Sequence, residues 1–361
     1  MSQPSTDNYW PEPFPADARV IELERISLAK LIDHDPEESA RLFSICTNLG
    51  FCYLDLTTHE KGLELINDAH ILHDISKPIF LDTPMNVKNE FKTRSAGRLD
   101  TGYRELGVDK EGIPNRVEIL NISQTGLFSG TEKYDLPDWL RGHETLFRST
   151  IRTANLIHNV ILSVLEKQLQ LPIGAFTSIH KLTDRSEAFL RLLRYPAHNK
   201  DRPKGVPLTP AHRDCVSVAL LFNWIGGFQI TNSTANIDHT ADEPEDSWHF
   251  IPPKPGHVIV NLGDALTIFT NGLLKSGKHR VVAPPGKQAE FDRYCVLLSA
   301  RPQESTPMRT FDSPLIPRGE YLKGDTMSVK EWSVYEVLKT VNKMRRQNGQ
   351  PLDENQESKV A

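Results

Sequence analysis

The sequence has few cysteines and no pattern that would bring them together. Only four occur in 361 residues, Cys46, Cys52, Cys215 and Cys295, and no CxxC motif is present. A disulfide framework and a zinc site built from thiolates are therefore not indicated. We expect four reduced thiols, as is usual in a cytoplasmic protein.

Long hydrophobic runs are also missing. No segment approaches the roughly 18 consecutive apolar residues of a membrane span. Residues 1–15 are polar and rich in proline, and they lack the basic-then-apolar pattern of a signal peptide. We therefore expect a cytoplasmic protein that has no membrane partner.

Neither sign of charge dominates the chain. Lys and Arg number 42 and Asp and Glu number 47, which gives a formal charge of −5. This balance provides no general attraction for nucleic acid, so we expect no nucleic-acid partner. The sequence also lacks a phosphate-binding loop, a Rossmann glycine pattern and an obvious Ser–His–Asp set.

The predicted elements change in kind along the chain. Helical periodicity indicates helices over 38–51, 59–80 and 138–169, and a last helix over 327–347. Between them, after Pro172, short apolar runs alternate with Gly, Pro, Asn or Asp and predict many short strands, among them Ala265–Thr270. The predicted fold class is α+β, mainly β with a helical N-terminal part. We expect a flexible leader over 1–17, a helical region over 18–185 packed on a β core over 186–302, and a C-terminal helix with a polar tail over 303–361.

A His-x-Asp tripeptide is the sharpest chemical feature. In an extended strand His212 and Asp214 point the same way, and His279, on another predicted strand, can supply a second imidazole. Two histidines and one carboxylate form the facial triad of non-haem Fe(II) oxygenases. Arg293 can hold a carboxylate through a two-pronged hydrogen bond, although a single strand-borne Arg is more often solvated.

The chain from His212 to Arg301 resembles the isopenicillin N synthase-like group of iron- and 2-oxoglutarate-dependent oxygenases. Besides the tripeptide, the order and spacing of several segments agree with that group: Gly226-Gly227-Phe228-Gln229-Ile230, Pro255-Gly256, Val260-Asn261-Leu262-Gly263-Asp264, Thr270-Asn271-Gly272, Lys275-Ser276 and His279-Arg280-Val281. Leu192-Leu193-Arg194-Tyr195-Pro196 is similar to a strand of isopenicillin N synthase itself. We expect Asn261, Gly263 and Asp264 only to close a turn between strands.

The resemblance implies a double-stranded β-helix (jelly-roll) core and a set of ligands. His212, Asp214 and His279 would bind Fe(II), and Arg293, with Tyr195 near it, would bind the cosubstrate 2-oxoglutarate. With O2, oxidative decarboxylation of 2-oxoglutarate to succinate and CO2 would be coupled to hydroxylation or desaturation of a small-molecule substrate, in specialised metabolism. The serine that the family places two residues after the arginine is Cys295 here, and a thiol is a weaker hydrogen-bond donor than a hydroxyl.

The substrate residues are predicted from the N-terminal part and from the segment before His279. They are Tyr103, Arg104, Ile119, Asn121, Phe269 and Asn271. We expect a monomer. Two alternatives stay open from the sequence: an oxidase of the isopenicillin N synthase type that uses no 2-oxoglutarate, and a non-catalytic binding protein on the same scaffold.

Overall fold

The structure is a computed structural model that describes residues 11–92, 100–108, 114–130, 134, 136–197, 206–231, 243–319, 321, 327–336 and 339. Much of the predicted leader and polar tail, and the end of the predicted 327–347 helix, lie outside these residues, although 329–336 are helical. Within the described part of the chain, no helix is both long enough and apolar enough to cross a membrane.

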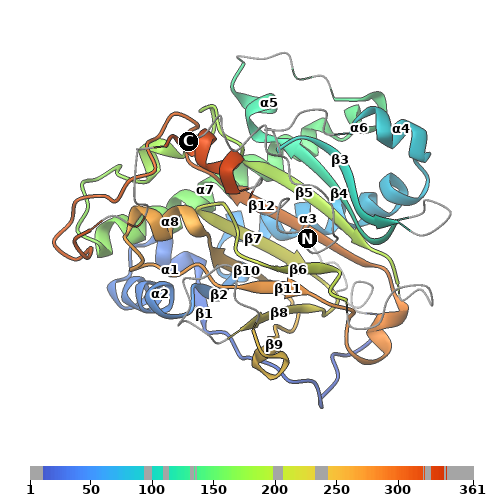
Figure 1. Ribbon diagram of the computed structural model, residues 1–361, viewed down its shortest axis with the longest axis horizontal. Helices are drawn as coiled ribbons and strands as arrows, with labels where there is room; N and C mark the ends of the chain where they lie inside the picture. Colours follow the sequence, from blue (N-terminus) through green and yellow to red (C-terminus); the bar gives the residue numbers. More distant parts are fainter. Residues whose placement is uncertain are drawn as a thin grey trace.

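Two sheets form the core (Figure 1). The larger sheet has the order β1-β2-β10-β7-β12-β5-β4-β3, with strands β1 (Arg25–Ser27), β2 (Phe51–Asp55), β10 (His257–Leu262), β7 (Val218–Asn223), β12 (Arg293–Ala300), β5 (Phe189–Tyr195), β4 (Pro114–Ser123) and β3 (Gly102–Val108). The smaller sheet has the order β6-β11-β8-β9, with strands β6 (Thr209–His212), β11 (His279–Val281), β8 (Phe228–Thr231) and β9 (Trp248–Phe250). This arrangement confirms the predicted α+β class with a jelly-roll core.

Helices cover the outer face of the larger sheet. The α-helices of the described residues are α1 (Leu28–Ile32), α2 (Pro36–Asn48), α3 (Glu60–Leu81), α4 (Met85–Glu90), α5 (Gln124–Phe128), α6 (Asp138–Arg141), α7 (Glu144–Gln168) and α8 (Asp264–Phe269). Of these, α3 and α7 pack on β5 and β12, and α3 lies behind the strands in Figure 1. The helices predicted over 38–51 and 59–80 are confirmed as α2 and α3.

Local signals explain where α2 begins. Pro36 occupies its first turn, and the Asp35 carboxylate accepts a hydrogen bond from the Glu38 backbone N–H at 2.8 Å. The predicted helix over 138–169 is present but interrupted, since α6 ends at Arg141 and α7 begins at Glu144.

One predicted strand is wrong. The run Ala265–Thr270 lies in and just after α8 instead of forming a strand. Every residue of α8 is buried, so its sequence has no polar alternation to separate a helix from a strand. The turn between two strands that we predicted at Asn261, Gly263 and Asp264 is also wrong. Asn261 lies inside β10, and Gly263 connects β10 to α8, which begins at Asp264.

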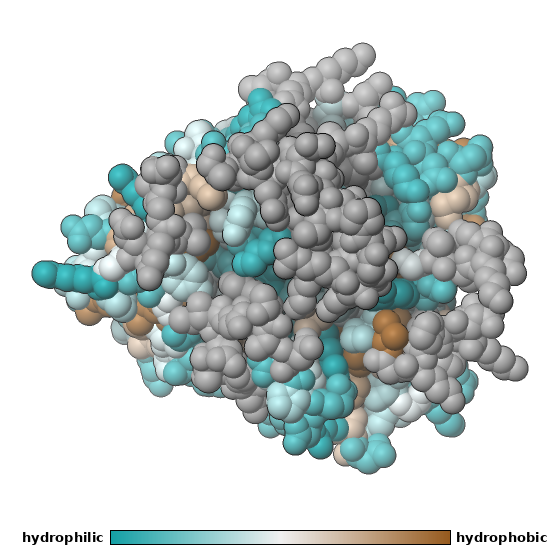
Figure 2. Space-filling model, viewed as in Figure 1, coloured by the Kyte–Doolittle hydropathy of each residue, from teal (hydrophilic) through white to brown (hydrophobic). Residues whose placement is uncertain are grey.

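The alternation of side chains along each strand separates two apolar layers. Residues such as Leu190, Leu192 and Val296 face the helices, whereas Leu193, Tyr195 and Cys295 share a cluster with Phe228, Ile230 and Val281 of the smaller sheet. On the outside, the described residues in Figure 2 are mostly hydrophilic, with hydrophobic side chains in small separate patches. The layer between the sheets is therefore the interior in which a site can be shielded from water.

Candidate metal and cosubstrate site

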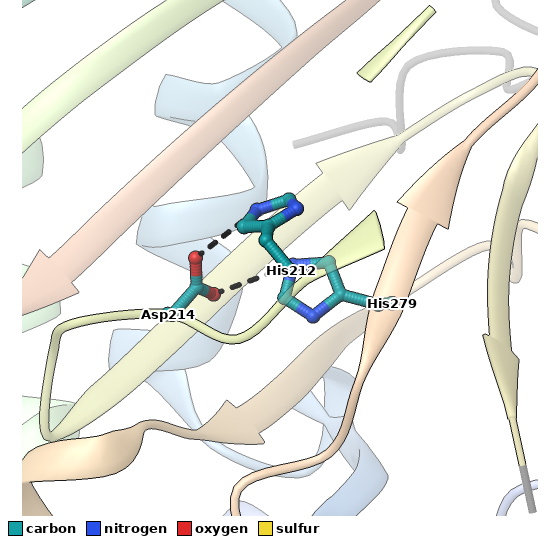
Figure 3. A group of neighbouring side chains, drawn as sticks. All are labelled: His212, Asp214 and His279. Atoms are coloured by element: carbon teal, nitrogen blue, oxygen red, sulfur yellow. Dashed lines mark ion pairs between the residues drawn. The ribbon is translucent and has the colours of Figure 1, made fainter. Parts of the chain in front are cut away.

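His212, Asp214 and His279 come together on the smaller sheet. His212 on β6 pairs in register with His279 on β11, and their ring centroids are 4.3 Å apart. Asp214 lies in the loop after β6 and points toward both rings (Figure 3). Its two carboxylate oxygens lie 3.6 Å from His212 Nε2 and 3.6 Å from His279 Nε2. The three ligand atoms lie within 4.8 Å of one another, so one metal ion can reach all of them.

The backbone orients both imidazoles for metal binding. His212 Nδ1 lies 2.8 Å from the Pro210 carbonyl oxygen and His279 Nδ1 lies 3.2 Å from that of Gly277. A carbonyl oxygen only accepts, so each Nδ1 donates its proton to the backbone, and each Nε2, on the side of Asp214, is the nitrogen left for a metal ion. Neutral imidazoles fixed in this way are the usual ligands of a metal with an open coordination position.

The charges of the three residues fit the same purpose. Burial opposes ionisation of Asp214, but His279, His212 and Asn261 outweigh it and hold the pKa of Asp214 well below its usual range. Burial, and next His212, lower the pKa of His279 to about 4. Burial also acts against a proton on His212, yet the hydrogen bond and charge of Asp214 outweigh it and raise the pKa of His212. An anionic carboxylate beside a neutral imidazole suits a divalent metal ion.

Asn261 is a site residue that the sequence analysis missed. From β10 on the opposite sheet, its amide donates a 2.8 Å hydrogen bond to Asp214 Oδ2, and it is 2% exposed. The Asp264 backbone N–H donates to the Asp214 carbonyl oxygen at 2.8 Å. Asp214 is thus fixed from the opposite sheet. A single amide in the otherwise apolar run of β10 was the signal that could have found Asn261.

Gly263 makes room for this loop, because a Cβ added at Gly263 would lie 2.1 Å from the Val216 carbonyl oxygen and 2.6 Å from that of Asp214. We expect Gly263→Ala to lower the free energy of unfolding by roughly 3 kcal/mol, the upper end of the cost of overpacking. Urea unfolding measures this change in the free energy of unfolding. At Gly142 an added Cβ meets nothing within 4 Å, so Gly142→Ala is the matched control. Equal stability of the two variants would contradict the close approach.

Arg293 lies between the sheets, in the inward row of β12, and is 1% exposed. Its Nε donates to the Gly226 carbonyl oxygen at 2.7 Å, and its guanidinium lies 5.0 Å from the ring centroid of Tyr195, its cross-strand partner. Its Nη2 is buried and has no hydrogen-bond partner among the described residues. A buried cation with an unused donor is costly unless a ligand supplies the acceptor, and a carboxylate does so best.

Tyr195 and Cys295 border the same arginine. The Tyr195 hydroxyl lies 3.2 Å from Thr209 Oγ1 on β6, which ties the two sheets together here. Cys295 is 1% exposed, and burial raises the pKa of its thiol although Arg293 acts in the opposite sense. The thiol therefore stays protonated.

The predicted substrate residues divide into two groups. Strand register places Arg104 of β3 and Ile119 and Asn121 of β4 on the inward face that carries Leu193 and Tyr195. Asn121 Oδ1 accepts a 2.8 Å hydrogen bond from Arg191 Nε on β5. These three residues therefore share a face with Arg293.

The structure places the other three elsewhere. Tyr103 is fully buried on the helix side of the sheet, where its hydroxyl donates to Glu118 Oε1 at 2.7 Å. Phe269 packs against Phe176 and Phe311. The Asn271 amide donates to the Pro317 carbonyl oxygen at 3.0 Å. Each of these side chains has structural partners outside the ligand group, so the three are not part of the candidate site.

A two-sheet jelly roll that carries two histidines, an aspartate and a buried arginine between its sheets defines a class of non-haem metal oxygenase. Residues 186–302 match the 2OG-Fe(II) oxygenase superfamily. A 2-oxoglutarate-dependent dioxygenase of Aspergillus fumigatus is 40% identical over 316 residues, which are 85% of this chain and 82% of the relative. The 2-oxoglutarate-dependent dioxygenase gloE of Glarea lozoyensis is 27% identical over 308 residues, covering 83% and 85%.

Solved structures share the fold. A Neurospora crassa protein crystallised in complex with alpha-KG and 5-formyluracil superimposes with a TM-score of 0.69 at 20% identity, covering 90% of this chain and 97% of that one. The chain belongs to the 2-oxoglutarate- and Fe(II)-dependent oxygenase superfamily. It is a dioxygenase, an oxidoreductase that uses Fe(II), 2-oxoglutarate and O2. The family assignment that the sequence resemblance implied is confirmed. A 2-oxoglutarate-dependent dioxygenase is neither of the two alternatives, the 2-oxoglutarate-independent oxidase and the non-catalytic scaffold.

Proposed function

We propose that His212, Asp214 and His279 hold Fe(II) and that Arg293 binds the distal carboxylate of 2-oxoglutarate, with Tyr195 and Cys295 beside it. One observation carries the proposal. The Nε2 atoms of His212 and His279 both face the Asp214 carboxylate, and the same interior holds the buried Arg293 Nη2, which has no acceptor among the described residues. The carboxylate would then supply an acceptor for Arg293 Nη2, which has none among the described residues.

We further propose that the substrate is a small molecule that is hydroxylated or desaturated, in specialised metabolism. In support, the Neurospora crassa protein has also been crystallised with thymine, and a Petromyces alliaceus relative, 26% identical over 58% of this chain, is named a proline hydroxylase. Fe(II) with 2-oxoglutarate and O2 supplies the oxidative decarboxylation to succinate and CO2 and the oxidation of a C–H bond. The cytoplasmic location and the monomeric state stay predictions.

The protein contributes orientation and shielding to this reaction. Asn261 fixes Asp214 so that its oxygens face the two imidazoles, and Arg293 sets the direction of the cosubstrate. The rings of Phe51 and Phe228 lie 5.9 Å and 5.2 Å from that of His279. This apolar packing excludes water from one side of the ligand group and lowers the local dielectric constant.

An anaerobic optical titration tests the proposal. We expect protein loaded with Fe(II) to develop a saturable visible metal-to-ligand charge-transfer band when 2-oxoglutarate is added, because the keto acid chelates the metal. Stoichiometric iron without a band would overturn the proposed place of the cosubstrate. Failure to bind Fe(II) at all would overturn the proposed metal ligands.

A further inference from the structure

Three arginines share the inward face of the larger sheet with the proposed site. Arg191 of β5 lies in the same row as Leu193 and Tyr195, and strand register brings Arg104 of β3 to the same face. Arg301 continues the inward row of β12, directly after the strand, and its guanidinium lies 5.8 Å from the Phe189 ring. Arg191 interacts electrostatically with both other arginines, so the three charges are neighbours.

Among the described residues, one ion pair with an acidic side chain is found for these three arginines. Arg301 Nη1 lies 3.0 Å from Glu187 Oε2. Arg191 donates to the uncharged Asn121, and among the described residues no acid pairs with Arg104. Arg104 Nε and Arg301 Nε are buried and find no hydrogen-bond partner in the part of the chain that the structure describes. Burial, and next the charge of Arg301, lower the pKa of Arg104. Burial, and next the charge of Arg104, lower the pKa of Arg191.

Such a group is costly unless something anionic joins it. Three guanidinium groups in a poorly solvated space repel one another; Glu187 pairs with Arg301, and Asp214 partly offsets the charge of Arg191. Arginine forks bind carboxylate and phosphate oxygens in pairs, which satisfies unused donors and charge together. The unused donors therefore favour an oxyanion as the missing partner.

The three arginines are placed to serve the substrate and not 2-oxoglutarate. In register, Arg293 pairs with Tyr195, whereas Leu297, four residues further along β12, pairs with Arg191. Four residues of a strand span about 13 Å, which separates Arg191 from Arg293. Arg104 is in register with Ile119 and Leu193 and lies three strands away from β12. Arg191 nevertheless interacts electrostatically with Asp214 and His212. A molecule held there lies beside the metal ligands.

We propose that the substrate carries a carboxylate or phosphate group that binds to Arg104, Arg191 and Arg301, with its oxidised carbon between these arginines and the metal ligands. The inference rests on the proposed function and names the substrate class of the same site. It makes the enzyme an oxygenase of small organic acids or phosphate esters.

Isothermal titration calorimetry with matched probes tests the inference. The probes are 3-phenylpropanoate and hexanoate, each with its primary amide, and 2-phenylethyl phosphate. The titrations use the full chain, both metal-free and loaded anaerobically with Fe(II) and 2-oxoglutarate. Charged hydrogen bonds of about 1.5–3 kcal/mol predict that an acid or the phosphate ester binds at least about tenfold more tightly than the matched amide. Preference for the carboxylates or for the phosphate identifies the source of the oxyanion.

Two variants assign that preference to the arginines. Arg104→Gln keeps much of the shape and loses the charge, so we expect the preference for the anionic probes to fall about tenfold or more. Arg152→Gln, on the exposed face of α7, removes the same charge from the protein and should keep the preference. Circular dichroism confirms that both variants fold.

The outcomes separate the inference from the proposed function. Equal binding of acids and amides by the metal-free and the loaded protein overturns the inference even if the charge-transfer band is normal. A missing band overturns the proposed function, while the metal-free titration still decides the inference. If Arg104→Gln weakens 2-oxoglutarate more than the anionic probes, the arginines hold the cosubstrate and the inference is wrong.

Discussion

His279→Ala is expected to abolish tight Fe(II) binding and, with it, all succinate formation. His279 supplies one of three ligand atoms, and its Nε2 is already aimed at Asp214 by the hydrogen bond of Nδ1 to Gly277. Loss of an outer partner of a ligand costs roughly 10- to 100-fold in metal affinity, so loss of a ligand itself should cost more. Iron content after anaerobic dialysis, measured together with succinate formation, checks the expectation.

The smaller sheet offers a matched control for this variant. His249 on β9 and His279 on β11 flank the same residue of β8, Ile230, from opposite sides. The Nδ1 of His249 also lies 2.9 Å from a backbone carbonyl oxygen, that of Ser247. His249→Ala therefore makes the same change in the same sheet outside the ligand group and should retain iron. Stoichiometric iron in His279→Ala would rule out the proposed ligand set.

The metal ligands could be predicted from the sequence because their geometry is local. Residues i and i+2 of an extended segment face one way, which puts His212 and Asp214 side by side before any tertiary structure is known. The partner His279 required the pairing of two strands far apart in sequence, and the ordered family motifs supplied it. Arg191 was missed for the opposite reason. Its strand is apolar on both faces, so periodicity could not tell which arginine points inward.

The substrate residues show the same limit of the sequence. Tyr103 and Arg104 are adjacent, and a strand sends adjacent side chains to opposite faces. Only one of the two could line the interior, and the register Arg104↔Ile119 decides in favour of the arginine. Phe269 was misjudged because the run that contains it is wholly buried and reads equally well as a strand. The strand register between β3 and β4 and the start of α8 at Asp264, not the residue types, determine which of these side chains reach the site.

Arg293→Met is expected to weaken 2-oxoglutarate binding by roughly 100-fold or more, since two charged hydrogen bonds are lost from a buried position. The change is measured as the midpoint of the charge-transfer titration. Fe(II) binding without 2-oxoglutarate should survive, because the arginine is not among the proposed metal ligands. Arg293→Lys keeps the charge but not the fork, so its loss should be intermediate. An unchanged midpoint in the folded Met variant would contradict the proposed role.

The same titration separates the arginine from the thiol beside it. Cys295→Ser replaces a weak donor with a stronger one at nearly the same size, next to Arg293 and in the same inward row. We therefore expect it to bind 2-oxoglutarate more tightly than the natural chain, in contrast to Arg293→Met. If the carboxylate lies at Arg293, both variants move the midpoint, in opposite directions. If it lies at Arg104, Arg191 and Arg301, neither variant should move the midpoint, because Arg191 lies about 13 Å along the strands from Arg293 and Arg104 lies three strands away from it.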